Sequence, residues 1–329
     1  MMKRSSFLKI LIFFCASGLF SCASTYNFEK LSRLVESNCY GGSSYELYKK
    51  ADPLPLERLN LSDRLNNNFS KRNLNIANAL GMLSFIDEYI KVLEEYEADP
   101  TLEKRIAYIE RYQRLSQRFE ASKMEISSVQ SELNCEEDRL RQVSQYLMGI
   151  EGKEIKNLTV GSILLAATWS IVSVFVLNDS DAAAYFGLGV GIIGAGLGYS
   201  MLKVKKPVYF THKRNHLKEV VLGPEQSELF PSSVWYYLNF IDTDGEAPKS
   251  MRGEILQKWR TLGVFVDIRS KDMPALQEKF FGEGGVYSSR ELELRASMYD
   301  QVSAKINLMM QDLNYLIIEF GKMQNKYRE

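Results

Sequence analysis

The chain has 329 residues, of which 45% are apolar, and this is enough for one large or two medium domains with packed cores. Its 41 basic and 41 acidic residues balance. This balance argues against a nucleic-acid-binding protein, because such proteins carry a basic excess or a basic stripe. Two histidines leave little for general acid/base chemistry at neutral pH or for His-rich metal sites.

The first 22 residues have the order of a secretory signal. A short basic stretch precedes an apolar run over residues 7–20, and small residues follow before Cys22. The four residues that end at Cys22, LFSC, resemble the lipobox of bacterial lipoproteins, whose Cys thiol carries a diacylglycerol with palmitate-type chains. The resemblance implies a signal peptide over residues 1–21, lipidation of Cys22 and, since no Asp follows Cys22, the outer membrane. An uncleaved signal anchor and ordinary cleavage near Ala23 stay open as alternatives.

Two further cysteines, Cys39 and Cys135, remain in the mature chain once the signal has left and Cys22 is lipidated. Outside the cytoplasm such a pair can oxidise. A bridge that closes so long a loop would contribute on the order of 4 to 5 kcal/mol in the chain-entropy model. The alternative is two separate, partly buried thiols.

Residues 22–157 are predicted to be one helical region. Asp99-Pro100 ends one helix and starts the next, and a long amphipathic helix over residues 101–150 pairs with its predecessor as a stalk. The apolar positions of the two helices are Ile76, Leu80, Leu83, Ile86, Ile90 and Leu93, then Ile106, Ile109, Leu115, Phe119, Ile126, Val129, Leu133, Leu140, Val143, Leu147 and Ile150.

A hydrophobic hairpin is predicted over residues 158–202. Residues 158–177 form a stretch of about 20 without a charge, which matches the length that a helix needs to cross a hydrocarbon core. A short polar break follows, then a second apolar stretch over residues 182–202 that ends at Lys203. Because the connection is so short, the two spans are antiparallel. The alternative is a buried core hairpin in a soluble domain.

Small residues recur every four positions along both arms of this hairpin. Such a face lets membrane helices approach closely, either arm to arm or between copies of the chain. The positions are Ser162, Ala166 and Ser170 in the first arm, and Ala183, Gly187, Gly191, Gly194, Ala195 and Gly198 in the second. Together with Cys22, this hairpin resembles the glycine zipper of some outer-membrane lipoproteins of the surface-antigen type.

The charges beside the hairpin conflict with the signal. Lysines flank both arms while Asp179 and Asp181 lie in the turn, so the positive-inside rule would leave both large regions in the cytoplasm. Export through a lipoprotein signal places both in the periplasm. We follow the signal, because positive-inside reflects insertion at the inner membrane, and the lysines would then meet anionic headgroups.

Residues 203–287 are predicted to be mixed. Short strands are expected at residues 208–211 and 264–268, and helices at residues 225–240 and 251–262. The last region, residues 288–329, begins with Ser288 and Glu291 at capping-box spacing and continues as a long amphipathic helix that packs beside the first long helix.

Motifs with catalytic or ligand-binding chemistry are weak. His212 and His216 lie four apart, but among basic residues and without a nearby acidic or Cys ligand, so an interfacial basic face is favoured over a metal site. The acidic turn at residues 242–246 lacks the bidentate Glu of a calcium loop. The glycines at residues 282–285 lack the Lys-Ser/Thr of a phosphate loop. No metal, cofactor or catalytic residue is predicted.

These patterns together predict a mainly α-helical fold: a bundle or coiled-coil stalk, a two-helix transmembrane hairpin and a few short strands after it. The function expected is that of a non-enzymatic structural or assembly lipoprotein of the bacterial cell envelope. Its partners are the lipid bilayer and either further copies of itself or other envelope proteins. Two alternatives stay open: a component of an export machine or pore, and an envelope enzyme with a site in residues 207–285.

Overall fold

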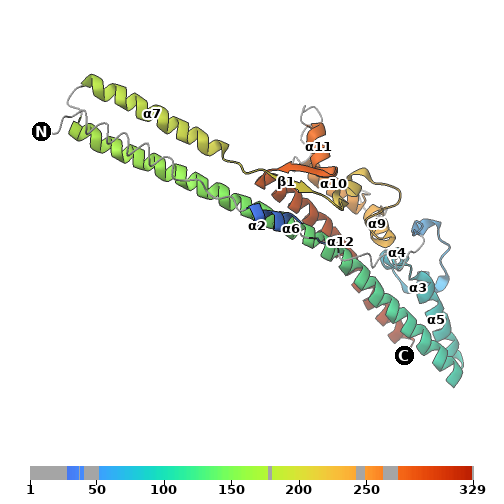
Figure 1. Cartoon of the computed structure of the whole chain (residues 1–329). Coiled ribbons are helices and arrows are strands. Elements are labelled where there is room, and N and C mark those ends of the chain that lie inside the picture. The colour runs from blue at the N-terminus through green and yellow to red at the C-terminus, as the bar shows by residue number, and fades with distance from the viewer. Residues whose placement is uncertain are drawn as a thin grey trace. The chain divides into compact units, whose positions relative to one another are not determined.

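The computed structural model describes residues 28–36, 38–40, 52–176, 180–241, 249–261 and 273–327 (Figure 1). The side chains at 28–30, 169, 171–190 and 273–276 lie outside this description. The described chain is mainly helical, as predicted. Its elements are α2 (Phe28–Glu36), η2 (Leu56–Arg58), α3 (Asp63–Asn68), α4 (Lys71–Ala79), α5 (Leu83–Ala98), α6 (Leu102–Val176), α7 (Ser180–Lys203), β1 (Val208–Thr211), α8 (His216–Leu222), α9 (Ser232–Asn239), α10 (Met251–Thr261), α11 (Met273–Phe281), β2 (Gly284–Tyr287) and α12 (Ser289–Lys326).

Local sequence signals set several of these boundaries. The predicted break at Asp99-Pro100 is confirmed, because it separates α5 from α6. The predicted capping box is confirmed too, since the Glu291 carboxylate accepts the Ser288 N–H at 2.8 Å and Ser288 Oγ accepts the Glu291 N–H at 3.4 Å. Strand β1 and helix α10 also form where they were predicted. The strand predicted at residues 264–268 falls outside the described residues.

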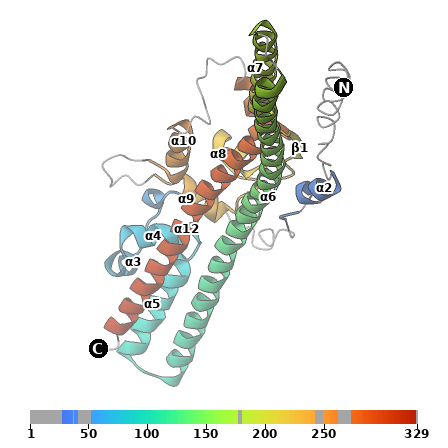
Figure 2. The same cartoon turned by 90° about the vertical axis from the view of Figure 1, so that its left-hand side faces the viewer.

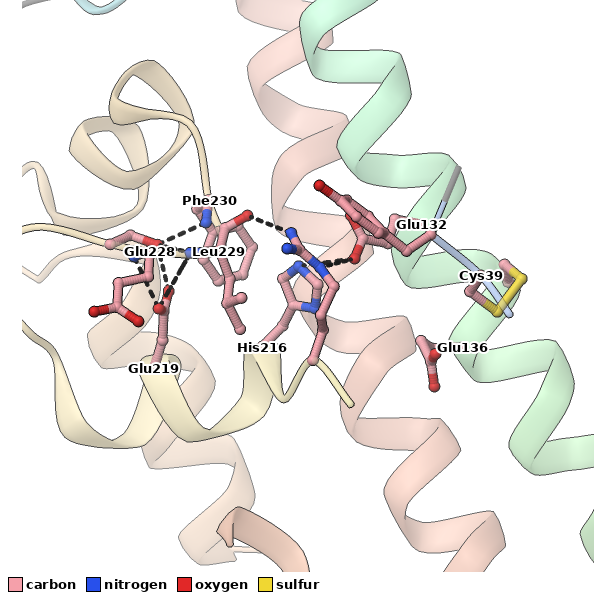
Figure 3. Close-up of polar contacts among 12 residues, drawn as sticks. Cys39, Glu132, Glu136, His216, Glu219, Glu228, Leu229 and Phe230 are labelled. Carbon is pink, nitrogen blue, oxygen red and sulfur yellow. Dashed lines mark hydrogen bonds and ion pairs between the residues drawn. A yellow bond between two sulfur atoms is a disulfide. The ribbon is translucent and has the colours of Figure 1, made fainter. Parts of the chain in front are cut away.

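The helix predicted over residues 225–240 is shorter than expected. It begins only at Ser232, as α9, and the preceding stretch is a loop. The Glu219 carboxylate accepts the backbone N–H groups of Glu228 and Leu229 at 2.9 and 3.2 Å, as Figure 3 shows. Because a side chain satisfies these donors, they are not available to a helix.

Contacts divide the chain into two compact units. Unit 1 comprises Met1–Glu36, Arg141–Tyr209 and Val286–Glu293, and unit 2 comprises Ser37–Leu140, Phe210–Gly285 and Leu294–Glu329. Helix α6 belongs to both and continues without a break through residue 157, where the sequence had suggested that a helical region ends and a hairpin begins.

Unit 2 is built on a bundle of α5, the first part of α6 and the last part of α12 (Figure 2). The ring of Tyr89 on α5 lies 5.1 Å from that of Phe320 on α12 and 5.7 Å from that of Tyr108 on α6. Further along, Ser303 Oγ of α12 donates to Asn134 Oδ1 of α6 at 2.7 Å. The predicted packing of the C-terminal helix beside the long helix is therefore confirmed. The helices bury Ile86, Ile90, Leu93, Leu115, Phe119, Ile126, Val129, Leu133, Leu140, Ile306, Met309, Leu313 and Leu316.

Two residues assigned to this apolar stripe are placed elsewhere. Ile106 and Ile109 are 54% and 41% exposed, so their assignment to the core was wrong. The reason is the aromatic packing at the start of α6, where the ring of Tyr108 contacts both Tyr89 and Tyr96 of α5. Tyr108 thus occupies the face toward α5, and the two isoleucines lie to either side of it.

Unit 1 has a much smaller core. Its buried apolar side chains are Leu31, Val143, Leu147, Val208, Tyr287 and Leu292. Beyond Leu147, no described side chain of α6 is buried, and none is buried over residues 191–207. The described part of the hairpin therefore projects from this core without covering its own apolar surface.

Candidate membrane hairpin

The C-terminal part of α6 and helix α7 form the predicted antiparallel hairpin (Figure 1). Its two arms meet near the base, where Thr159 Oγ1 of α6 lies 3.7 Å from Met201 Sδ of α7. Below this contact, Lys206 Nζ pairs with Glu154 at 2.7 Å, and the Lys206 backbone N–H donates to Glu151 at 2.8 Å. The base of the hairpin is thus held by an ion pair and hydrogen bonds.

Large apolar side chains on both arms are exposed. Ile163 and Leu164 are each 61% exposed on α6, and Ile192 is 67% exposed on α7. Exposed apolar side chains scattered singly are common on soluble proteins, whereas several on two adjacent helices are less so. The other large exposed apolar side chains of the described hairpin are Ile155, Val160, Ile193, Tyr199 and Leu202.

The hydroxyl groups of the hairpin bond to their own helices. Thr168 Oγ1 donates to the Leu164 carbonyl at 2.8 Å, and Ser200 Oγ donates to the Gly196 carbonyl at 2.8 Å. The same kind of bond is made by the three other Ser and Thr residues on the described arms, Thr159, Ser162 and Ser170. A hydroxyl that is satisfied in this way needs no water, so these side chains suit an apolar surrounding.

The described glycines of α7 are not packed against other described parts of the chain. A Cβ built on Gly191, Gly194 or Gly198 would have no atom within 4 Å apart from its own helix backbone, and the same holds for Gly161 on α6. Of the other predicted packing residues, Ala166 and Ala195 lie on the described arms. Ala183 and Gly187 fall among residues whose side chains are not described. Arm-to-arm packing is thus absent at the described glycines, and their faces are open.

Among the residues that the structure describes, no helix combines the length and the apolar character that crossing a membrane requires. The middle of the predicted hairpin, residue 169 and residues 171–190, has no described side chains and falls outside that statement. The transmembrane hairpin therefore stays a prediction. Cys22, the predicted lipidation site, also lies outside the described residues.

A disulfide joins the N-terminal segment to α6. Cys39 and Cys135 are bonded, with their Cα atoms 5.5 Å apart and 96 residues of separation in sequence (Figure 3). The sequence left open a disulfide or two separate thiols, and the structure has the disulfide. Beside it, the guanidinium of Arg214 lies 4.1 Å from the centre of the Tyr40 ring and pairs with Glu132 at 2.7 Å. The segment around Cys39 is therefore attached to unit 2 both covalently and through Tyr40.

The two histidines lie in the interior of unit 2. His216 begins α8 and is fully buried against the Phe230 ring, and neither of its ring nitrogens has a hydrogen-bond partner among the described residues. Burial lowers the pKa of His216 to about 3, with a further lowering by Arg214. Burial likewise lowers the pKa of His212 to about 2. Both are neutral, and among the described residues no group of three His, Cys, Asp or Glu side chains is placed to hold a metal ion. The interfacial basic face expected for this pair was wrong, because both rings lie in the interior.

A buried arginine was missed by the sequence analysis. The side chain of Arg295 on α12 is fully buried, and its guanidinium donates to the Phe280 carbonyl at the end of α11 and, at 2.9 Å, to Asn215 Oδ1. Asn215 in turn donates to the Gly282 carbonyl at 3.0 Å. The carbonyls at a helix C-terminus carry partial negative charge, which stabilises this cation. Nothing in the local sequence around Arg295 distinguishes it from an exposed helical arginine.

The mixed region after the hairpin contains one groove of note. It has a volume of about 520 Å³ and is lined in part by Trp235, Tyr236 and Glu57. The polar groups of its two aromatic residues are used within the fold, since Trp235 Nε1 donates to the Pro224 carbonyl and Tyr236 Oη donates to Asn75. Ser232 also lines the groove, and its hydroxyl forms no hydrogen bond with a carboxylate among the described residues. The groove therefore gives no support to the alternative of an envelope enzyme with a site in residues 207–285.

Comparisons with protein-family models, with curated proteins and with solved structures find no match to this chain.

Proposed function

We propose that the protein is a non-enzymatic structural or assembly lipoprotein of the bacterial envelope, attached to one membrane through lipidated Cys22 and through insertion of the 158–202 hairpin. The observation that carries this proposal is the exposure of Ile163, Leu164 and Ile192 on two adjacent helices. At about 25 cal/mol per Å² of apolar surface removed from water, transfer of such side chains into a bilayer is favourable. The self-bonded hydroxyls of the hairpin are compatible with the same environment.

The position of α2 supports the use of one membrane by both anchors. Helix α2 belongs to the same compact unit as the hairpin, and its Leu31 is buried. Cys22 lies six residues before Phe28, the first residue of α2, so even a fully extended chain keeps the two within about 22 Å. A lipidated Cys alone is a modest attachment, whereas inserted helices hold a protein effectively irreversibly. In this proposal the hairpin provides most of the attachment.

The open glycine faces support self-association as the way in which the hairpin acts. Small residues allow backbones of membrane helices to approach closely, and a Cβ at Gly191, Gly194 or Gly198 would meet no described side chain within 4 Å. A second copy of α7 matches this face in length and side-chain size. The alternative, a ring of hairpins that forms a pore, uses the same face and is separated by a conductance measurement in planar bilayers. A monomer that opens no channel would exclude the pore.

The proposal is tested by fractionation of the wild type beside Cys22→Ala and beside a variant that lacks residues 158–202. We expect Cys22→Ala to abolish signal processing yet to leave the protein in the alkali-resistant membrane fraction. Removal of the hairpin should leave a lipidated protein that alkaline carbonate releases in part. Protease added to intact cells and to spheroplasts reports the side on which the C-terminal region lies. If the wild type is found in the soluble fraction, or if Cys22→Ala is processed as before, the proposal fails.

A further inference from the structure

The base of the hairpin carries a dense group of lysines, which we call the base lysines. Lys153 and Lys156 lie on α6, Lys203 ends α7, and Lys205 and Lys206 follow it in the chain. All five belong to unit 1. Two acidic residues, Glu151 and Glu154, lie in the same stretch of α6, so the formal charge of this group of seven residues is positive.

Both carboxylates are already used within the fold. Glu154 pairs with Lys206 Nζ at 2.7 Å. Glu151 accepts the backbone N–H of Lys206 at 2.8 Å and the hydroxyl of Ser289 at 2.9 Å. Glu154 is therefore paired with the Lys206 ammonium, and Glu151 is hydrogen-bonded by the Lys206 backbone and by Ser289. Of the five base lysines, Lys206 has the only partly buried side chain.

The other four base lysines are exposed, and none of them forms an ion pair with a described residue. Four neighbouring ammonium groups without an ion-pair partner repel one another. An anionic surface against them reduces this repulsion and supplies the missing counter-charge. The cluster is thus complementary to a surface with regularly spaced negative charges.

The position of the base lysines identifies that surface. On the side of the hairpin, Ile155 and Leu202 are 39% and 80% exposed directly beside Lys156 and Lys203. The ammonium group of Lys203 lies 4.6 Å from the centre of the Tyr199 ring, one turn further into the hairpin. Tyrosine and lysine side chains that adjoin an apolar helix are typical of the boundary between headgroups and hydrocarbon.

We propose that Lys153, Lys156, Lys203 and Lys205 form a binding surface for the phosphate groups of anionic phospholipids in the leaflet that the hairpin enters. This inference rests on the proposed membrane insertion and adds the class of lipid. The lysines act through charge, so the surface distinguishes anionic from zwitterionic headgroups and does not require one particular anionic headgroup. Salt weakens the preference, because the four side chains are exposed and a Debye length of about 8 Å at physiological ionic strength screens such contacts.

The test uses the full chain reconstituted into phosphatidylcholine bilayers that contain trace spin-labelled phosphatidylglycerol or phosphatidylcholine. Electron paramagnetic resonance then reports the relative association constant of the two lipids at the protein surface. One lysine near a charged membrane surface contributes roughly a fivefold factor in affinity, so the wild type should prefer phosphatidylglycerol by at least about fivefold. The preference should fall toward one at high salt.

Two variants make the comparison specific. Replacement of the four lysines by Gln should reduce the preference to about one, whereas replacement by Arg should keep it. The matched control replaces four exposed lysines of unit 2, Lys91, Lys218, Lys249 and Lys258, by Gln, which changes the net charge equally and should leave the preference unchanged. Equal association of both lipids with the wild type, or an equal loss in the control, would overturn the inference. Failure of membrane insertion itself is seen separately, as release of the wild type from the bilayer by alkaline carbonate.

Discussion

The bundle of unit 2 and the hairpin of unit 1 are both helical, yet they differ in what they do with apolar side chains. In the bundle, Leu133 of α6 and Leu313 of α12 are fully buried. In the hairpin, which continues the same helix α6, Leu164 is 61% exposed. The bundle is a core that excludes water by its own packing, whereas the hairpin has an apolar surface that nothing described in the chain covers.

The two regions also differ in their polar groups. Polar side chains of unit 2 bond across the fold, as Arg72 does to Asp312 at 2.5 Å and Tyr237 does to the same carboxylate at 2.8 Å. Hydroxyls of the hairpin bond to their own helix, one turn back. Cross-fold bonds specify one tertiary structure, while bonds within a helix leave its surface free for a different surrounding. In unit 2 the polar contacts join distant parts of the chain, whereas the hydroxyls of the described hairpin join only residues of one helix.

The largest effect should come from charge placed on the hairpin. Leu164→Arg together with Ile192→Arg should remove bilayer retention, since Arg at the centre of a membrane helix costs about 2.5 to 3.5 kcal/mol each. The measurement is resistance to alkaline carbonate of the reconstituted protein in a chain that begins at Ala23, which carries neither the apolar signal nor a lipidated Cys22. As a control, Leu102→Arg with Ile318→Arg changes two exposed apolar residues of unit 2 and should have no effect. If both double variants are retained equally by the bilayer, the exposed apolar residues of the hairpin do not differ in function from those of unit 2.

Loss of the disulfide should act on unit 2 and not on the hairpin. Cys39→Ser or Cys135→Ser opens a loop of 96 residues, which in the chain-entropy model costs about 4 to 5 kcal/mol of unfolding free energy. Guanidinium unfolding followed by the fluorescence of Trp235 and Trp259 measures this loss. Carbonate resistance should stay as in the wild type. A disulfide that matters only to the N-terminal segment would leave the unfolding midpoint unchanged.

Acid should destabilise unit 2 through its buried histidines. Their pKa values are lowered in the folded state, to about 2 for His212 and about 3 for His216, so below pH 6.5 the unfolded chain binds protons that the folded chain does not. Stability therefore falls as the pH drops from about 6.5, by about 2 kcal/mol for each histidine at pH 5.

The matched variant for this prediction is His216→Phe. The ring nitrogens of His216 have no hydrogen-bond partner among the described residues, so Phe should be tolerated at pH 7 beside Phe230. Denaturant unfolding at pH 7 and pH 5 should show about half of the wild-type pH dependence. If His216→Phe leaves the change of unfolding free energy between pH 7 and pH 5 unchanged, the pKa of His216 is not lowered by folding. In that case the carboxylate of Glu132, 3.7 Å from His216 Nε2, stabilises the protonated ring.

The smallest effect on folding is expected for Gly194→Ala. The direction of its effect differs between the monomer and an oligomer. A Cβ at this position meets nothing within 4 Å, so in the monomer Ala should favour α7 by about 0.5 to 1 kcal/mol. If two copies pack through this face, the same methyl group should weaken the oligomer. Cross-linking in bilayers, with Gly161→Ala on α6 as the control, separates the two effects. A stable oligomer in the Gly194→Ala variant would exclude this face as the contact.

Much of the helical architecture was predictable because its causes are local. Pro100 cannot donate a backbone hydrogen bond, so it separates α5 from α6 wherever the chain goes afterwards. Ser288 and Glu291 satisfy each other's backbone donors within four residues. The spacing of apolar residues along α6 and α12 identified most of the bundle core for the same reason, since helical periodicity depends on sequence alone.

The errors lie where distant side chains compete with local preference. Ile106 and Ile109 fit the apolar period of α6, but the packing of Tyr108 against Tyr89 turns another face of the helix toward α5. The loop before α9 has a local cause that the prediction of a helix over residues 225–240 overlooked, Pro231, which disfavours helix in the residue before it. It also has a tertiary cause, because the carboxylate of Glu219 accepts the N–H groups of Glu228 and Leu229. Neither the partner side chain nor its position can be read from a window of neighbouring residues.

The sequence by itself determined the mainly helical class, the break before α6, the paired apolar stretches of the hairpin and the cysteines available for a bridge, because each depends on residue type and spacing. Only the tertiary structure decided that Cys39 and Cys135 are bonded, that His212 and His216 are buried and neutral, and that Arg295 lies inside the fold. It also decided that Gly191, Gly194 and Gly198 of α7 face open space among the described residues, and that the ammonium of Lys206 pairs with Glu154 at the base of the hairpin. Such features depend on which surfaces meet, and the contacts that bring them together join residues far apart in the chain.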